Sequence, residues 1–404
     1  MTLQAFSYPT LYKDKIYVAP YGLTEVVDYM LVMNVATNEF KRIPLLVDDS
    51  KEKWQSGVIV DDKIYFLPYN ESKIIILDTN TDTVEYLHTL TARGKWLYPH
   101  VYENKIVALP YGEHDIFDIA IVLDTTNNTV LYKSIVTDVD VEKKWHTTQL
   151  LGNKLIGVPR GEDTSNYFPY AIEFNCDTCD YVLTDLSEHW ADYDKEPMTN
   201  KKFTTLACYK DKLYAPPYSE NPNFDVLLTY NNGWTAQRTG IKATSRKYYS
   251  HITASNGKIF FPPAGHDEDW SEMLVIDANT NKWWVKDLGI GKESKKYFTG
   301  VENSQGKLYF IPRGGCVCEP EESWKSQGDL AEVLVIDTNT EKHYTIDVSE
   351  YFKDSTTIEK YNRCVIKDDV IYAFPYGESE SFQTVLIFDT LTDTVKGTID
   401  LNAV

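Results

Sequence analysis

Short apolar runs, separated by turn residues, follow one another along the whole chain. The stretch 53–90 shows them most clearly, with runs at 54–60, 63–68, 73–79 and 83–89. These runs are rich in β-branched and aromatic residues and lack the 3.6-residue period of a helix, so each predicts a β-strand. We name the four strands A, B, C and D.

The junctions between the runs carry residues that are typical of hairpins. Strands A and B are joined by pairs such as DD at 61–62 and GN at 152–153, and strands C and D by turns such as DTNTD at 78–82. Aspartate, asparagine and glycine tolerate the positive φ angles of tight turns. Each group of four runs therefore predicts a four-stranded antiparallel sheet.

Strand B carries the motif K-[I/L]-Y-x-x-P, which recurs eight times in close variants. Proline lacks the amide donor of a sheet ladder, so it is tolerated where a strand ends. The closing prolines lie 42 to 63 residues apart and are Pro20, Pro68, Pro110, Pro159, Pro217, Pro263, Pro312 and Pro375. Four strands repeated eight times predict an all-β fold, an eight-bladed β-propeller. We expect one domain covering 1–404, with units that start near residues 5, 53, 95, 144, 202, 247, 296 and 360.

Two stretches add a resemblance to a known family. GKLYFIPRGG at 306–315 resembles the Kelch strand that ends in a glycine pair, and VIDANTNKWW at 275–284 resembles the Kelch turn followed by tryptophan. The blade pattern is Kelch-like over the whole chain, although most units carry P-Y-G in place of the glycine pair. Kelch-like propellers include interaction adaptors, sugar epimerases and a copper oxidase, so the resemblance implies a fold and no single activity.

The loop lengths indicate which face is functional. In an up-and-down blade, the A–B and C–D turns share one face, and the B–C and D–A connections share the other. The short turns are all A–B or C–D, whereas long connections such as 185–202, 314–332 and 347–360 are B–C or D–A. Variable loops on a rigid scaffold commonly carry binding residues. We expect the site on the B–C/D–A face, at the mouth of the propeller's central channel.

Two sets of repeated residues are candidates for that face. The first opens strand A as lysine, aromatic, any residue and hydroxyl, and the second follows the strand B proline. They include Lys53, Trp54, Lys95, Trp96, Lys144, Trp145, Tyr69, Tyr111 and Tyr376. Ammonium groups and aromatic faces suit an acidic sugar or a peptide carboxylate. The alternative is that the aromatics wedge neighbouring blades and the lysines pair across them, as regular recurrence favours.

Residues that break the repeat are the stronger candidates, because the scaffold does not require them. They are Arg160, Arg313, Arg363, His100, His114, His146, His251 and His266. No two histidines have a metal-ligand spacing, and each histidine has a structural alternative. The GHDEDW loop at 265–270 could supply an acid or a base.

The cysteines and acidic residues point only weakly to a metal. CDTC at 176–179 lies on a C–D turn, on the face opposite CVC at 316–318, so one four-cysteine zinc site is not expected. A local disulfide within CDTC is the alternative. Three acidic residues are spaced four apart, namely Glu188, Asp192 and Glu196. This spacing is compatible with metal ligands on a short helix and equally with a solvated acidic loop. We predict no metal and no cofactor.

Composition limits the partners. Sixty acidic and 40 basic residues give a net charge of -20, which disfavours nucleic acid and anionic membranes. Six cysteines suit a reducing compartment, and neither a secretory signal nor an apolar run of about 18 residues occurs. We predict a cytoplasmic monomer that acts as a scaffold for a protein, an acidic glycan or an acidic peptide. The alternative is a carbohydrate-active enzyme, an epimerase or lyase on acidic sugars.

Overall fold

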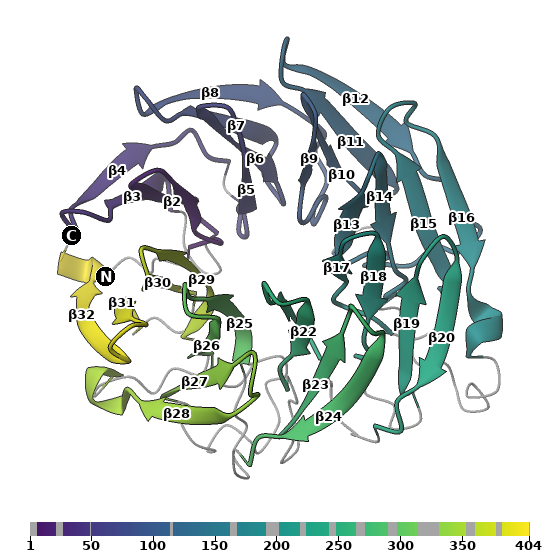
Figure 1. Cartoon of the computed structure of the whole chain (residues 1–404). Helices are drawn as coiled ribbons and strands as arrows, with labels where there is room; N and C mark the ends of the chain where they lie inside the picture. The colour runs from purple at the N-terminus through teal and green to yellow at the C-terminus, as the bar shows by residue number, and fades with distance from the viewer. Residues whose placement is uncertain are drawn as a thin grey trace, which may run out of the picture. The chain divides into compact units, whose positions relative to one another are not determined.

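The fold consists of eight consecutive four-stranded sheets (Figure 1). The computed structural model describes residues 6–21, 27–48, 50–113, 116–161, 168–190, 202–218, 224–241, 248–263, 271–289, 297–313, 331–352, 360–376 and 382–403. Within these ranges, no helix is long and apolar enough to cross a membrane.

Each of the first four blades is one contiguous segment of chain. Blade 1 contains β1 (Thr10–Tyr12), β2 (Lys15–Val18), β3 (Tyr29–Asn34) and β4 (Phe40–Pro44). Blade 2 contains β5 (Trp54–Val60), β6 (Lys63–Pro68), β7 (Lys73–Asp78) and β8 (Thr83–His88). Blade 3 contains β9 (His100–Tyr102), β10 (Lys105–Ala108), β11 (Ile119–Asp124) and β12 (Thr129–Ser134). Blade 4 contains β13 (Thr148–Leu151), β14 (Lys154–Gly157), β15 (Tyr170–Asn175) and β16 (Tyr181–Asp185).

The remaining blades follow the same order. Blade 5 contains β17 (Ala207–Tyr209), β18 (Lys212–Ala215), β19 (Val226–Tyr230) and β20 (Trp234–Arg238). Blade 6 contains β21 (Ile252–Thr253), β22 (Lys258–Phe261), β23 (Glu272–Asp277) and β24 (Lys282–Asp287). Blade 7 contains β25 (Tyr297–Glu302), β26 (Lys307–Pro312), β27 (Glu332–Asp337) and β28 (His343–Asp347). Blade 8 contains β29 (Tyr361–Lys367), β30 (Val370–Pro375), β31 (Thr384–Asp389) and β32 (Thr394–Asp400).

These sheets confirm the predicted eight-bladed β-propeller of four-stranded antiparallel blades. The described helical residues form only short 3-10 turns, η1 (Ser187–His189), η3 (Ser349–Phe352) and η4 (Leu401–Ala403). The strands of blade 2 begin and end within one residue of the predicted runs. Each blade is built from consecutive strands, as predicted.

The chain divides into two compact units. The N-terminal unit comprises Met1–Leu206, Leu213–Ser219 and Val226–Thr239. The C-terminal unit comprises Ala207–Lys212, Glu220–Asp225 and Gly240–Val404. The predicted single domain stays a prediction.

Side-chain hydrogen bonds explain the recurring C–D turn. Asp78 ends β7, and its Oδ1 accepts hydrogen bonds from the amides of Asn80 at 2.9 Å and Thr81 at 3.0 Å. Asp82 then adopts a φ of 55°, in the left-handed region that the turn requires. The same first bond recurs at the ends of other C strands, at Asn34, Asp124, Asn175, Asp277, Asp337 and Asp389.

The lysine that begins strand B forms ion pairs with the C–D turn of the next blade. The Nζ atom of Lys15 lies 3.0 Å from Oδ1 of Asp82, which belongs to the C–D turn of the next blade. In the C-terminal unit, Lys258 pairs with Glu341 and Lys307 with Asp393 in the same way. Partly exposed pairs of this kind contribute about 0 to 1 kcal/mol each. In these three blades the repeated lysine therefore joins neighbouring blades.

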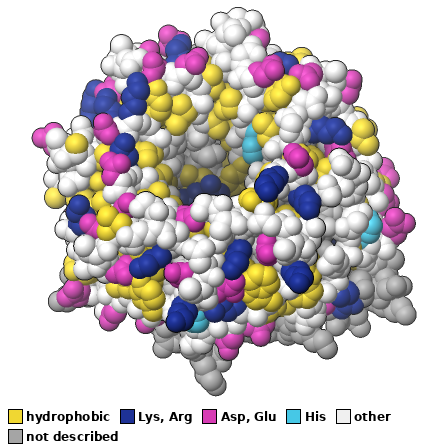
Figure 2. All heavy atoms as spheres, viewed as in Figure 1, with side chains coloured by type: hydrophobic (Ala, Val, Ile, Leu, Met, Phe, Trp, Pro, Cys, Tyr) yellow, Lys and Arg dark blue, Asp and Glu magenta, His cyan; other side chains and the backbone are white. Residues whose placement is uncertain are grey.

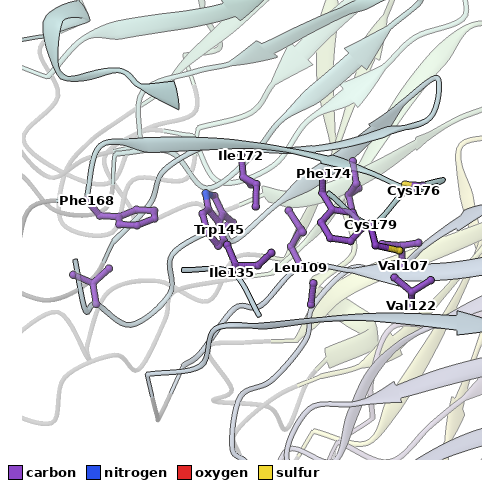
Figure 3. Packing of buried hydrophobic residues seen from close by; sticks show 13 residues of the cluster. Val107, Leu109, Val122, Ile135, Trp145, Phe168, Ile172, Phe174, Cys176 and Cys179 are labelled. Carbon is purple, nitrogen blue, oxygen red and sulfur yellow. The ribbon is translucent and has the colours of Figure 1, made fainter. Parts of the chain in front are cut away.

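Hydrophobic clusters fill the spaces between neighbouring blades. Figure 3 shows one of them, in which Trp145 lies among Leu109 and Ile135 of blade 3 and Ile172 and Phe174 of blade 4. Strand C is buried on both faces, as in β7, because a blade packs against each side of it. Strand D alternates between exposed and half-buried residues, as in β8, because it forms the outer edge. The core thus lies between the blades.

Candidate functional site

A belt of backbone hydrogen bonds joins consecutive blades of the N-terminal unit at the end of strand B. The amide of Lys53 donates to the carbonyl of Tyr21 in blade 1 at 2.9 Å, and the amide of Tyr69 donates to the carbonyl of Lys53 at 2.7 Å. The same two steps continue through Lys95, Tyr111, Lys144, Arg160, Lys202 and Tyr218. Each such bond contributes about 0.5 to 1.5 kcal/mol. The backbone at both repeated positions therefore connects consecutive blades of this unit.

The lysines that open strand A are buried inside the blades. Lys53 and Lys95 are fully buried, and Lys144 is 1% exposed. The Nζ atom of Lys95 donates to the carbonyls of Glu71 at 2.7 Å and Ala92 at 2.8 Å, and burial lowers the pKa of its ammonium group to about 8. Lys144 pairs with the carboxylate of Asp118. These contacts favour the blade-joining interpretation over ammonium groups that line a mouth.

The tryptophans that follow these lysines lie between blades. Trp54, Trp96 and Trp145 are each at most 1% exposed. Their indole Nε1 atoms donate to carbonyls at the start of strand C in their own blade, at 2.8, 2.8 and 2.9 Å. The side chains are thus fully engaged by the fold, which again favours the alternative of blade wedges.

The glutamate that follows the Pro-Tyr pair in blade 2 has a structural partner. The carboxylate of Glu71 is buried and accepts hydrogen bonds from the amide of Asp48 and, at 2.7 Å, from the hydroxyl of Ser50. Burial raises the pKa of this carboxyl group, while these hydrogen bonds oppose the rise. The glutamate thus fixes the D–A connection of the preceding blade against its own B–C loop.

The post-proline side chains form a continuous layer on the B–C/D–A side of the N-terminal unit. The rings of Tyr21 and Tyr69 lie 6.3 Å apart, as do those of Tyr69 and Tyr111. Arg160 takes the next place. Its guanidinium lies 6.0 Å from the ring of Tyr111 and 5.9 Å from that of Tyr218, and its Nη1 atom donates to the hydroxyl of Tyr111 at 3.0 Å.

A second group of aromatic side chains meets this layer at Tyr111. The ring of His146 lies 5.4 Å from that of Tyr111 and 5.7 Å from that of Tyr98. Tyr98 in turn stacks on Tyr8, with ring planes only 7° apart. We call Tyr98, Tyr111, His146, Arg160 and Tyr218 the Arg160 cluster. His146, Tyr111, Arg160 and Tyr218 are buried, whereas Tyr98 is half-buried.

Tyr98 has a strained backbone. Its φ angle is 44°, a left-handed conformation that a bulky aromatic residue rarely adopts. The other described non-glycine residues with positive φ are Asn, Asp, Glu, Lys and Cys. Strain of this kind costs about 1 to 3 kcal/mol and is concentrated at functional sites. It adds to the case for the Arg160 cluster as the site in this unit.

A second set of candidates meets in the C-terminal unit. The guanidinium of Arg313 in blade 7 lies 5.9 Å from the ring of Tyr249 in blade 6. Lys360 is fully buried, and its amide donates to the carbonyl of Arg313 at 2.8 Å. Arg363 and His251 interact electrostatically, since the charge of Arg363 and burial both lower the pKa of His251. Tyr376 continues the backbone belt, because its amide donates to the carbonyl of Lys360 at 2.9 Å.

Two histidines should make the stability of the folded protein depend on pH. Burial lowers the pKa of His100 and of His251 to about 4, from about 6.5 in the unfolded chain. The folded state therefore binds fewer protons between these values, so its stability is complete above pH 6.5 and falls as the pH drops toward 4. We expect a loss of about 1 to 3 kcal/mol per histidine in urea titrations between pH 7 and pH 4.5. A His100→Asn variant should show a shallower loss, and an unchanged slope would contradict this role.

Some candidates lie outside the described residues. These are His114, His266, the GHDEDW loop, CVC at 316–318, Asp192 and Glu196. Glu188 is described and lies in η1. Cys176 and Cys179 are buried free thiols on the C–D turn of blade 4, so the local disulfide considered as an alternative is not formed. No group of three histidine, cysteine or carboxylate residues in the described part of the chain could hold a metal ion.

Sequence reasoning did not select every residue of the Arg160 cluster. Tyr98 occupies the hydroxyl position of strand A, where most units carry serine or threonine, and this size difference was the available signal. Tyr218 follows the repeat, so no departure marked it. Its role depends on Arg160 as a neighbour, which only the structure shows.

Comparison with known proteins supports the fold alone. No protein-family model and no curated protein matches the chain. Its structure is similar to that of apo AztD from Citrobacter koseri, with a TM-score of 0.57, 11% identity, and coverage of 99% of this chain and 95% of that chain. The dihydro-heme d1 dehydrogenase NirN in complex with DHE gives a TM-score of 0.61 and 9% identity, with coverage of 92% of this chain and 71% of that chain. BamB from Moraxella catarrhalis gives a TM-score of 0.56 and 9% identity, with coverage of 93% of this chain and 97% of that chain. The chain is an eight-bladed β-propeller, and its Kelch-like character stays a prediction.

Proposed function

We propose that this protein is a binding scaffold whose Arg160 cluster recognises a ligand that carries a carboxylate, such as an acidic glycan or an acidic peptide. The observation that carries the proposal is the position of Arg160. It replaces a repeated tyrosine and lies between the rings of Tyr111 and Tyr218, with His146 on the same tyrosine. Most other blades carry a tyrosine at this place, so the repeat itself does not require the arginine.

The chemistry of the cluster suits a carboxylate on a ring or a peptide. A guanidinium is a planar donor that pairs with a carboxylate through two hydrogen bonds. Tyr98 is half-buried and could pack against a sugar ring or an aliphatic chain. Acidic and basic side chains are interleaved over the visible face in Figure 2, and the net charge is -20. Selectivity for an acidic ligand would therefore come from local contacts rather than from the overall charge.

The test uses a substitution that restores the repeat. Arg160→Tyr should keep the blade packing and remove the cation. The probes are trigalacturonic acid, its methyl ester, a glutamate-rich peptide and the corresponding glutamine peptide, titrated by calorimetry. Because a hydrogen bond to a charged group contributes about 1.5 to 3 kcal/mol, we expect the variant to bind one of the acidic probes about 10- to 150-fold more weakly.

The control removes the same charge elsewhere. Arg238 is exposed on β20 of the same unit, so Arg238→Tyr should leave affinity unchanged. Equal affinity of the Arg160→Tyr variant and the unmodified protein would contradict the proposal, as would the absence of binding to both acidic probes.

A second candidate is an epimerase or lyase that acts on acidic sugars. It is favoured by the contact of His146 and Arg160 with one tyrosine, because proton transfer needs an acid or base beside the group that binds the carboxylate. Incubation with trigalacturonic acid distinguishes the two, with an unsaturated product followed by absorbance and an epimer by NMR. Turnover that His146→Asn abolishes, with binding retained, would replace the scaffold by the enzyme.

A further inference from the structure

The C-terminal unit contains a second place where departures from the repeat converge. Arg313 stands where most blades carry a tyrosine after the strand B proline, and Arg363 stands where most carry a hydroxyl in strand A. They belong to neighbouring blades 7 and 8. Lys360 lies between them in the belt, since its amide donates to the carbonyl of Arg313. Two arginines that break the repeat thus lie in neighbouring blades of this unit, and the backbone of Lys360 connects to that of Arg313.

Both arginines interact with the same segment of blade 6. The guanidinium of Arg313 lies over the ring of Tyr249 at 5.9 Å. Arg363 acts on His251, two residues further along. Ser250 lies between these two contacts, is 8% exposed, and its Oγ atom has no hydrogen-bond partner among the described residues. A buried hydroxyl without a partner is costly, so its presence needs an explanation.

A backbone irregularity helps to place Arg363. The pairing of β29 with β30 shifts register between Tyr361 and Cys364, so that Asn362 and Arg363 lie in a β-bulge. Bulges redirect side chains and are common beside functional sites. The bulge also occurs in blade 2, between Trp54 and Gly57, where it contains Ser56. Blade 8 thus uses a repeated backbone feature to present a cation in place of a hydroxyl.

We propose that Arg313, Arg363 and Ser250 form a second anion-binding site, which takes a doubly charged tetrahedral oxyanion, that is, a phosphate or sulfate group. Two guanidinium groups provide planar donors for such an anion, and the serine hydroxyl provides a further donor. A dianion balances these two positive charges better than a single carboxylate does. The inference is independent of the proposed function, because it concerns other residues in the other unit.

The test measures binding of simple anions at constant ionic strength. Inorganic phosphate, phenyl phosphate, sulfate and acetate are titrated against the full chain, with chloride as the balancing ion. We expect both phosphate probes and sulfate to bind, phenyl phosphate more tightly than inorganic phosphate because its ring can contact Tyr249, and acetate to bind at least tenfold more weakly. Tighter binding of inorganic phosphate would identify a free anion as the ligand. Equal binding of acetate, or no binding of phosphate and sulfate, would overturn the proposal.

Substitutions that restore the repeat locate the site. Arg313→Tyr and Arg363→Ser should each weaken phosphate binding at least tenfold, and Ser250→Ala several-fold. Arg238→Tyr, on the exposed face of β20 in the other unit, should leave phosphate binding unchanged and serves as the matched control. Circular dichroism and a urea midpoint near that of the unmodified protein show that each variant is folded. Folded Arg313→Tyr and Arg363→Ser variants that bind phosphate with full affinity would contradict the assignment.

Discussion

Replacement of Trp145 by alanine is expected to lower the free energy of unfolding by about 3 to 5 kcal/mol. Its indole is 1% exposed and lies between blades 3 and 4, where its ring meets that of Phe168 at 5.4 Å. It also packs on Gly157, since a Cβ atom there would lie 3.1 Å from the indole. Alanine would leave a cavity that rigid sheets on both sides cannot close. Urea denaturation followed by circular dichroism gives the value.

Two further variants separate the contributions to this loss. Trp145→Phe keeps most of the ring but removes the hydrogen bond to the carbonyl of Tyr170, so it should cost less than Trp145→Ala. Val182 is exposed on the outer strand β16, and Val182→Ala should change stability by less than about 0.5 kcal/mol. A loss below about 1 kcal/mol for Trp145→Ala would show that the blades do not depend on this wedge.

Gly94→Ala is expected to cost about 2 to 5 kcal/mol. Gly94 precedes the lysine of blade 3 and has a φ of 63°, a conformation that costs an alanine about 1 to 2 kcal/mol. A Cβ atom would also lie 2.5 Å from the backbone nitrogen of Glu113, which cannot move freely because its amide donates to the carbonyl of Gly94. Overpacking of this kind adds about 1 to 3 kcal/mol.

Gly152 offers a matched control for the backbone contribution. Its φ is 58°, and a Cβ atom there would have no neighbour within 4 Å. Gly152→Ala should therefore cost only the conformational part, about 1 to 2 kcal/mol. The difference between the two variants, measured by urea denaturation, isolates the close approach at Glu113. Equal losses would mean that the loop at Gly94 adjusts without cost.

Most of the fold could be predicted from the sequence because its determinants are local. A proline at a strand end, an aspartate that binds its own turn and alternating apolar residues each act over a few positions. Because each of these signals occurs in up to eight units, a unit in which one signal is weak can still be recognised from the others. Blade 2 shows the result, since β5 to β8 match the predicted runs.

The roles of the repeated residues could not be predicted in the same way. Lysine before tryptophan is compatible with an exposed mouth or a buried contact, and only the position of the neighbouring blade decides between them. The ammonium group of Lys95 donates to the carbonyl of Glu71 in the B–C loop of blade 2 and to that of Ala92 in the connection between blades 2 and 3. Arg160 and Arg313 could be recognised as departures from the repeat, because most units carry a tyrosine at their position. Which aromatic rings surround them depends on contacts between blades, as with Tyr218 and Tyr249.

The most direct test of the account compares unfolding and binding for the same two variants, Arg160→Tyr and Gly152→Ala. We assign the fold to residues that keep the repeat and recognition to those that break it. Arg160→Tyr should therefore change the free energy of unfolding by less than about 1 kcal/mol but lose at least tenfold in affinity for the acidic probe. Gly152→Ala should lose stability and keep full affinity. If Arg160→Tyr instead unfolds more easily than Gly152→Ala and binds the acidic probe as well as the unmodified protein does, Arg160 belongs to the scaffold and the account is wrong.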